Sequence, residues 1–319
     1  MKTVDSVLQL IGNTPLVKLN KVTSGLEAEV WVKPEYLNPT GSIKDRVALR
    51  MIQDAERQGL LKPGYTIVES STGNTGTSLS FIGTLRGYRV VIYETTPGKM
   101  GQEKKNLMMG YGAEVRTISP EEYEDLRKGV PGAEIELPGR RLCLALEKKN
   151  PKVWWARQFA NPSSVEAQKE TGREILEQTG GKVEAFVASI GTGGTLMGVA
   201  EVLKEKNRKT MVVGAIPPGS KREMKPGKPY PKSEIEGGII ADMLMKPGLI
   251  DDVVTITDEE AVEMTESLWR EEGIFAGVSS GANVVVALRL AKGMKKGQKV
   301  VAIMHDSGDR YLTTKHYVT

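Results

Sequence analysis

The stretch Asn38-Pro39-Thr40-Gly41-Ser42-Ile43-Lys44-Asp45-Arg46-Val47 decides how this sequence is interpreted. It follows an apolar run from Ala28 to Val32 that predicts a strand, and it leads into apolar residues with helical spacing. Asn38-Pro39 and Gly41 mark a turn, and Ser42 followed by Asp45 has the spacing of a capping box. The pattern therefore places Lys44 in the first turn of a helix.

A lysine at such a position is unusual, because a helix N-terminus carries partial positive charge and favours anions. The dipole and partial loss of hydration are expected to make such a lysine easier to deprotonate than an exposed lysine, whose pKa is about 10.4. A lysine that forms a Schiff base needs a neutral amine. The alternative is a lysine that simply extends to solvent, and this segment alone leaves both interpretations open.

Composition excludes several classes of protein. The chain has 319 residues, which suffices for one large or two ordinary domains, with 39% hydrophobic and 26% charged residues. The net charge of +4 is small and the lysines are spread along the chain, so no nucleic-acid partner is expected. No apolar run approaches a membrane span and the N-terminus has no signal core, so we expect a cytoplasmic protein without a membrane partner.

The side chains that carry chemistry are few. Cys143 is the single cysteine, which excludes an intrachain disulfide, and it is expected to be a small apolar filler. The two histidines, His305 and His316, argue against a histidine-rich metal centre, so no metal is expected. If the protein is an enzyme, the difficult chemistry is expected to belong to a cofactor.

Strand and helix patterns alternate along most of the chain, which predicts an α/β fold with mainly parallel sheets. The expected strands after the lysine helix are 65–69, 89–93, 114–118, 183–190, 211–216, 253–256 and 299–304. The pattern weakens between Pro120 and Lys152, where we expect a surface excursion with one short helix. Trp154-Trp155 then returns to buried structure and marks a domain boundary.

Three loops before expected helices are candidate binding sites. Gly191-Thr192-Gly193-Gly194-Thr195 joins a buried strand to a helix and suits a phosphate; a plain β-to-α turn is the alternative, and the spacing of a dinucleotide fingerprint is missing. Ser71 to Gly76 has hydroxyl, amide and backbone donors for a carboxylate, although such loops are also common turns. In Gly277 to Gly281 a serine is expected to be an N-cap, or else a partner for a ring nitrogen.

Taken together, these motifs resemble the cysteine synthase and cystathionine β-synthase family of pyridoxal-phosphate (PLP) enzymes, with the tryptophan-synthase-β-like fold. Six motifs occur in the family's order: Ile11 to Leu16, Asn38 to Arg46, Thr72 to Gly76, Gly191 to Thr195, Gly277 to Gly281 and Ser307 to Leu312. The resemblance implies two open, twisted, mainly parallel sheets with helices on both faces and an active site between two domains. The larger domain would comprise 1–40 and 155–319, and the smaller, mobile domain 41–154.

The resemblance also implies roles for individual residues. Lys44 would carry the cofactor and move protons, Asn74 would bond the ring hydroxyl oxygen, and Ser279 would meet the pyridine nitrogen. The phosphate would be bound by Gly191, Thr192, Gly193, Gly194 and Thr195. The substrate would be bound by Ser71, Thr72, Gly73, Asn74, Thr75, Gln158 and Gly237.

The sequence departs from the family pattern at several places. Ser71-Thr72 stands where the family has Thr-Ser, and Gln168 stands where relatives often carry histidine. The segment from Pro120 to Lys152 and Glu236-Gly237-Gly238-Ile239 are also irregular. These departures concern the identity of the substrate and leave the cofactor unaffected.

The expected activity is β-replacement on an activated serine, through an α-aminoacrylate intermediate, with sulfide as the nucleophile and L-cysteine as the product. O-acetylserine is the expected substrate, and Lys221-Arg222 raises O-phosphoserine as an alternative. Cystathionine β-synthase or cysteine desulfhydrase activity, or an inactive binding or scaffold protein, are the other possibilities. The resemblance further implies a homodimer and a possible complex with the C-terminal tail of a serine acetyltransferase.

Overall fold

The computed structural model describes residues 3–94, 101–127, 137–218, 246 and 248–312, which form two compact units. The larger unit comprises 3–43, 165–218, 246 and 248–309, and the smaller comprises 44–94, 101–127, 137–164 and 310–312. The division expected from the sequence assigned 155–164 to the larger domain. In the structure these residues belong with the smaller unit, because Trp155 pairs with Val68 and the Gln158 N–H bonds to Glu69.

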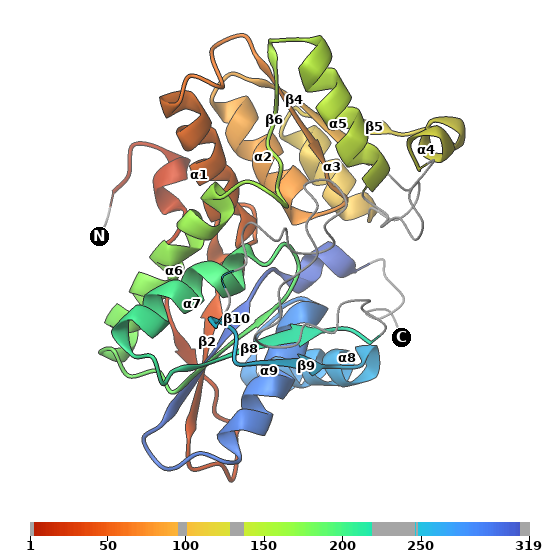
Figure 1. Cartoon of the computed structure of the whole chain (residues 1–319). Coiled ribbons are helices and arrows are strands. Elements are labelled where there is room, and N and C mark those ends of the chain that lie inside the picture. Colours follow the sequence, from red (N-terminus) through yellow and green to blue (C-terminus); the bar gives the residue numbers. More distant parts are fainter. Residues whose placement is uncertain (1–2, 95–100, 128–136, 219–245, 247, 313–319) are drawn as a thin grey trace. The chain divides into compact units, whose positions relative to one another are not determined.

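The larger unit contains a six-stranded sheet in the order β1-β2-β10-β7-β8-β9 (Figure 1). All neighbours are parallel except β1, which is antiparallel to β2. The central strands are apolar runs because both faces of the sheet are covered. The strands are β1 (Val17–Lys18), β2 (Glu29–Pro34), β7 (Ala185–Ser189), β8 (Met211–Ile216), β9 (Asp252–Thr255) and β10 (Lys299–Met304).

Helices cover both faces of this sheet. One face packs on α8 (Asp258–Ser267) and α9 (Val278–Ala291), and the other on α7 (Gly194–Lys206), against which α6 (Ser163–Thr179) lies. The helix pairs approach closely at glycines. A Cβ at Gly281 would lie 2.2 Å from the Ala261 carbonyl oxygen, and one at Gly198 would lie 2.3 Å from the Val165 carbonyl oxygen. These glycines therefore set the spacing of α8 against α9 and of α6 against α7.

The smaller unit contains a four-stranded, wholly parallel sheet in the order β5-β4-β3-β6. Its helices also lie on both faces, α2 and α3 on one and α4 and α5 on the other (Figure 1). Its strands are β3 (Thr66–Ser70), β4 (Arg89–Glu94), β5 (Glu114–Thr117) and β6 (Val153–Trp155). Its helices are α1 (Lys44–Arg57), α2 (Asn74–Leu85), α3 (Gln102–Gly110), α4 (Pro120–Arg127) and α5 (Leu137–Lys149). The prediction of two mainly parallel sheets with helices on both faces is thus confirmed.

The expectation of a surface excursion with one short helix between Pro120 and Lys152 is wrong. The described parts of this segment, 120–127 and 137–152, contain the helices α4 and α5, and both pack on the sheet. Cys143 of α5 is fully buried in a cluster with Val68 and Trp155, which would face water without this helix. Burial raises the pKa of the Cys143 thiol well above its usual value, so Cys143 is the apolar filler that its sequence context predicted.

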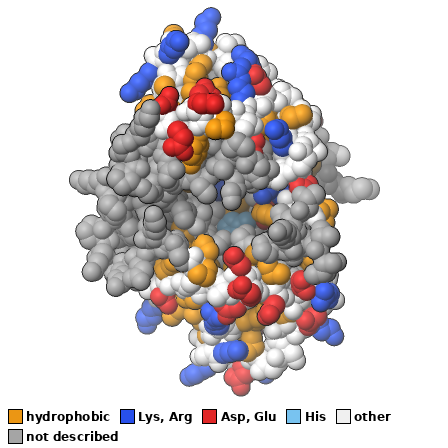
Figure 2. Space-filling model, turned by 90° about the vertical axis from the view of Figure 1, so that its right-hand side faces the viewer, with side chains coloured by type: hydrophobic (Ala, Val, Ile, Leu, Met, Phe, Trp, Pro, Cys, Tyr) orange, Lys and Arg blue, Asp and Glu red, His pale blue; other side chains and the backbone are white. Residues whose placement is uncertain are grey.

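The surface of the described residues carries mixed charge. Figure 2 shows both acidic and basic side chains among the described residues of the face drawn. Within the described ranges, no helix is long and apolar enough to cross a membrane. Among the same residues, no group of three or more His, Cys, Asp and Glu side chains is arranged to hold a metal ion.

Candidate active site

The glycine-rich loop of the larger unit follows β7 and leads into α7. Gly193 has a φ of +80°, a left-handed conformation that glycine adopts without strain, and Gly194 is the first residue of α7. Thr192 and Thr195 are buried in the same loop. The N–H groups of a first helical turn have no partner within the helix and favour an anion. The segment from Gly191 to Thr195 therefore has the backbone geometry of an anion site, and its binding of a cofactor phosphate stays a prediction.

Ser279 lies in the first turn of α9. The expectation that a serine would be the N-cap is wrong, because the N-cap is Gly277 and no side chain caps the helix. The Gly277 N–H donates to the Asp306 carbonyl oxygen at 3.0 Å, which fixes the start of the helix beside the end of β10. Ser279 is half-buried, and its role as the partner of the ring nitrogen stays a prediction.

These two segments belong to one edge of the larger sheet. Strands β7 and β10 are parallel neighbours, so the loops that follow them lie at the same edge, where open α/β sheets bind ligands. Ser189 ends β7 and His305 follows β10, and the Ser189 Oγ lies 3.4 Å from the His305 Nδ1. The Asn283 Nδ2 lies at the same distance from that nitrogen and donates to the Ile303 carbonyl oxygen at 2.8 Å. The larger unit thus presents the predicted phosphate and ring-nitrogen sites on one surface.

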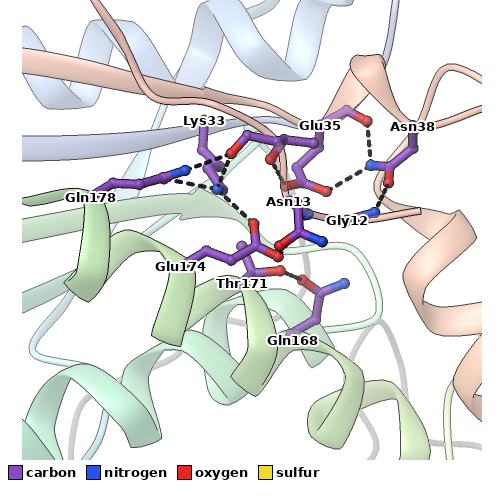
Figure 3. Close-up of polar contacts among 10 residues, drawn as sticks. Gly12, Asn13, Lys33, Glu35, Asn38, Gln168, Thr171, Glu174 and Gln178 are labelled. Carbon is purple, nitrogen blue, oxygen red and sulfur yellow. Dashed lines mark hydrogen bonds and ion pairs between the residues drawn. The ribbon is translucent and has the colours of Figure 1, made fainter. Parts of the chain in front are cut away.

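A buried polar network precedes the lysine segment (Figure 3). The fully buried Lys33 ammonium group lies 2.7 Å from a Glu174 carboxylate oxygen and donates to the Thr14 carbonyl oxygen at 2.6 Å. Glu35, also fully buried, accepts from the Thr14 hydroxyl and from the Asn38 amide, each at 2.8 Å. Because the side chains of Lys33, Glu35 and Asn38 each meet a partner, the network holds the end of β2 in one conformation.

The network continues into the backbone just before Lys44. The Asn38 Oδ1 accepts from the Gly12 N–H at 2.8 Å, and the Asn38 carbonyl oxygen accepts from the Gly41 N–H at 2.8 Å. The Ile43 N–H donates to the His305 carbonyl oxygen at 2.9 Å. Hydrogen bonds at Asn38, Gly41 and Ile43 therefore fix the backbone directly before Lys44.

Lys44 is the first residue of α1 in the smaller unit, as the sequence predicted. The next residue, Asp45, is fully buried and accepts a hydrogen bond of 2.6 Å from the Ser78 hydroxyl. Ser78 lies one turn after Asn74, the first residue of α2. This bond ties the start of the lysine helix to the start of the helix that carries the predicted substrate loop.

The loop from Ser71 to Thr75 joins β3 to α2. The Ser71 hydroxyl oxygen accepts from the Gly73 N–H at 3.2 Å and from the Gly76 N–H at 3.1 Å. A serine hydroxyl that accepts twice still has one proton to donate, which is what a carboxylate ligand needs. The Ser71-Thr72 order therefore keeps a donor hydroxyl in the loop, and the binding of a substrate carboxylate there stays a prediction.

Arg310 fixes the orientation of the Asn74 side chain. Its Nη1 donates to the Asn74 Oδ1 at 2.7 Å, and arginine has donors only, so the atom facing it must be the oxygen. The Asn74 Nδ2 is then the other terminal atom of the amide, and it is a donor. A donor is the correct partner for an ionised ring oxygen, the role that the resemblance predicts for Asn74.

Gln158 follows β6 and reaches the end of β3, so the structure brings it to the predicted carboxylate loop. Its Nε2 donates to the Ser70 carbonyl oxygen at 2.8 Å, directly before Ser71. Its backbone N–H donates to the Glu69 carboxylate at 2.9 Å. Among the other predicted positions, Gly237 and Lys221-Arg222 lie outside the described residues.

Local sequence patterns do not reveal the residues that support the site. Glu69, Arg310 and Asn38 lie within or beside the motifs, yet nothing in local periodicity assigns them a partner. A glutamate inside an apolar strand was the one available signal, because a buried carboxylate must find donors. The structure supplies the partners, which lie from 1 to 236 positions away in the chain.

Comparisons with known proteins agree on one family. The family described as "Pyridoxal-phosphate dependent enzyme" matches residues 7–306. A cysteine synthase of Staphylococcus aureus (strain Mu50) is 40% identical over 319 residues, which cover 99% of this chain and 98% of that protein.

Solved structures give the same result. A cysteine synthase of Entamoeba histolytica is 35% identical with a TM-score of 0.85, covering 99% of this chain and 91% of that chain. A hydrogen sulfide-producing enzyme of Fusobacterium nucleatum is 34% identical with a TM-score of 0.82, covering 97% of this chain and 100% of that chain. The similarity extends over almost the whole chain in each case.

Proposed function

The chain belongs to the family of pyridoxal-phosphate-dependent enzymes, and we propose that it is a cysteine synthase. It would replace the β-substituent of an activated serine with sulfide and release L-cysteine. O-acetylserine is the proposed substrate, and O-phosphoserine is the alternative. The observation that carries the proposal is Lys44 at the first position of α1, tied through Asp45 and Ser78 to the helix that begins at Asn74.

The residues that would hold the cofactor come from the segments described above. The N–H groups of Gly191 to Thr195 would bind its phosphate, Ser279 its ring nitrogen and Asn74 its ring oxygen, while Lys44 would hold it covalently. When bound, pyridoxal phosphate withdraws electrons from the α-carbon of the amino acid. A neutral serine at the ring nitrogen weakens this withdrawal, which favours loss of a β-substituent.

The remaining work belongs to the chain's own side chains. The amine of Lys44, once released, would remove the α-proton of the substrate, and the acetate or phosphate at the β-carbon would then leave. The hydroxyls of Ser71, Thr72 and Thr75 and the first N–H groups of α2 would bind the substrate carboxylate, with Gln158 beside them. Binding this carboxylate orients the α-proton toward Lys44.

Absorbance spectroscopy tests this proposal. The purified protein should have a near-visible band from bound cofactor, and the band should change on addition of O-acetylserine or of O-phosphoserine. Lys44→Ala should form L-cysteine at less than about a thousandth of the wild-type rate, since it lacks the proton acceptor. Wild-type turnover by Lys44→Ala, or a protein that cannot hold the cofactor, would reject the proposal.

Sulfide release is the second candidate function, because the similar Fusobacterium nucleatum protein is a hydrogen sulfide-producing enzyme. Cystathionine β-synthase activity is a further alternative on the same scaffold. Assays with three substrate pairs separate them: O-acetylserine with sulfide, L-serine with homocysteine, and L-cysteine alone. Turnover with the first pair at least tenfold above the others supports the cysteine synthase.

We also propose a cytoplasmic homodimer that can receive the C-terminal tail of a serine acetyltransferase. The support is the near-complete match to cysteine synthases. Light scattering after size exclusion would test the dimer by giving about twice the 34.8 kDa mass of the chain. A synthetic tail peptide should compete with O-acetylserine, and absence of competition would remove that part of the proposal.

A further inference from the structure

The carboxylate of Glu69 is a buried polar centre of the smaller unit. Its side chain is fully buried in β3 and accepts three N–H groups. The Oε1 accepts from the Ser70 N–H at 2.8 Å and the Trp155 Nε1 at 3.1 Å, and the Oε2 accepts from the Gln158 N–H at 2.9 Å. Arg140, itself buried over the Phe159 ring, offsets the negative charge from α5. A charge buried in this way needs a reason, since an apolar residue would avoid the desolvation penalty.

The position of this carboxylate suggests the reason. The backbone ladder between β3 and β6 ends where the Ala156 N–H donates to the Val68 carbonyl oxygen at 3.2 Å. Strand β6 ends at Trp155, and beyond it the Glu69 carboxylate joins β3 to the following segment by accepting from the Gln158 N–H. The Gln158 side chain completes the bridge through the Ser70 carbonyl oxygen at 2.8 Å.

Only a carboxylate can satisfy this set of partners. All three are N–H groups of backbone or indole, which cannot rotate to become acceptors. A glutamine at position 69 could keep its oxygen toward Ser70 and Trp155, but its NH₂ group would then face the Gln158 N–H. Two donors would oppose each other at that one contact, and Gln158 would be displaced.

We propose that Glu69 is a positioning residue of the substrate-carboxylate site, acting through Gln158. This inference rests on the proposed function, in which Gln158 and the loop from Ser71 to Thr75 bind the carboxylate. Glu69 touches neither substrate nor cofactor, and it acts by fixing where the backbone of Gln158 lies relative to the end of β3.

The test compares Glu69→Gln with Trp155→Phe in the cofactor-loaded enzyme. Trp155→Phe removes one donor from the Glu69 carboxylate, whereas Glu69→Gln replaces the oxygen that accepts from the Gln158 N–H, so only Glu69→Gln affects the contact with Gln158. The dissociation constant of L-serine is measured from the change in cofactor absorbance, and that of L-serinamide, which lacks the carboxylate, is measured in parallel.

Glu69→Gln should bind L-serine about tenfold more weakly, as expected for one disturbed hydrogen bond to a charged ligand, and L-serinamide within about twofold of wild type. Trp155→Phe should bind both within about twofold of wild type, with a lower Tm. Unchanged L-serine binding by Glu69→Gln, or an equal loss in Trp155→Phe, would overturn the proposal.

A second readout needs neither substrate nor cofactor chemistry. Amide hydrogen exchange of the peptide that contains Gln158 should be faster in Glu69→Gln and unchanged in Trp155→Phe. If Glu69→Gln does not fold, Glu69→Asp replaces it, since it keeps both acceptors but withdraws them by one methylene. A wild-type protein whose spectrum responds to no amino acid would reject the proposed function, whereas unchanged exchange in either variant of Glu69 would reject the positioning role alone.

Discussion

Glu35 in the larger unit and Glu69 in the smaller are both fully buried glutamates, and each needs hydrogen-bond donors for its carboxylate. The two side chains obtain these donors from different kinds of partner. Both side chains are 0% exposed, and both lie near the end of a strand that leads to a predicted site. Glu35 accepts from side chains, the Thr14 hydroxyl and the Asn38 amide. Glu69 accepts from backbone and indole N–H groups.

The difference lies in what can rotate. A hydroxyl can turn from donor to acceptor, so the Thr14 partner of Glu35 can adjust to a changed side chain. The N–H groups around Glu69 belong to the backbone and to the Trp155 indole ring and can only donate, so the side chain at position 69 must accept from all of them. The comparison indicates that burial of a carboxylate alone does not predict how much stability a substitution costs. The cost also depends on whether the hydrogen-bond partners can rotate.

The largest expected effect follows from removing the cation near Glu35. Lys33→Met would leave the Glu174 carboxylate and the Thr14 carbonyl oxygen without the ammonium group, at a cost of about 3 kcal/mol in unfolding free energy. Urea unfolding at pH 7 measures it. The control is Lys18→Met, whose exposed pair with Glu29 contributes less than about 1 kcal/mol. Equal losses would mean that burial does not distinguish these pairs.

The second effect tests the comparison directly. Glu69→Gln should lose about 2 kcal/mol of unfolding free energy, because an N–H donor would face the Gln158 N–H. Glu35→Gln should lose less than about 1 kcal/mol, because the Thr14 hydroxyl can rotate to accept from the new NH₂ group. The same urea experiment compares the two variants. A larger loss for Glu35→Gln would refute the role assigned to rotatable partners.

The third and smaller effect is the pH dependence of the stability difference between wild type and Glu69→Gln. Burial is the largest influence on Glu69 and raises its pKa above the usual value, against the N–H donors that lower it. A raised carboxyl pKa stabilises the folded protein below the unfolded pKa, about 4.3, and this stability is lost as pH rises toward the folded pKa. The stability advantage of wild type over Glu69→Gln should therefore shrink from pH 4 upward, by about 1.4 kcal/mol per unit of pKa difference. An advantage that grows with pH would contradict this direction.

The smallest expected effect concerns Glu56, whose pKa is lowered, in contrast to that of Glu69. Burial alone would raise its pKa, but hydrogen bonds from Arg86 and from the Tyr88 hydroxyl outweigh burial and lower it. Tyr88 shows the other side of this contact, because burial and the bond to Glu56 raise its pKa to about 12.

A lowered carboxyl pKa adds stability above the unfolded pKa, and this stability is lost as pH falls through the folded pKa. Glu56→Gln should therefore lose less than about 1 kcal/mol at pH 7 and nothing measurable near pH 3. Thermal unfolding of both proteins across this range checks the sign. A loss that persists at pH 3 would indicate packing in place of charge.

Much of the fold followed from local patterns. The limits of β8 and β10 coincide with the sequence predictions, and Lys44 lies in the first turn of α1 as predicted, because apolar runs, glycines and helical periodicity are properties of neighbouring residues. The helix α5 is not predicted from the sequence, because Gly, Pro and charged residues obscure its helical pattern. The helix is stabilised by packing of Cys143 on the sheet, and sequence periodicity does not report that packing.

The candidate site divides in the same way. The sequence by itself determined the family, the cofactor and the lysine at a helix start, since these depend on residue types at short spacing. The tertiary structure alone decided which atoms support them: the carboxylate of Glu69 beneath Gln158, the Arg310 guanidinium that turns Asn74, and the Lys33 network before Lys44. The physical reason is that a buried polar group takes its partner from whichever distant segment the fold brings within about 3 Å.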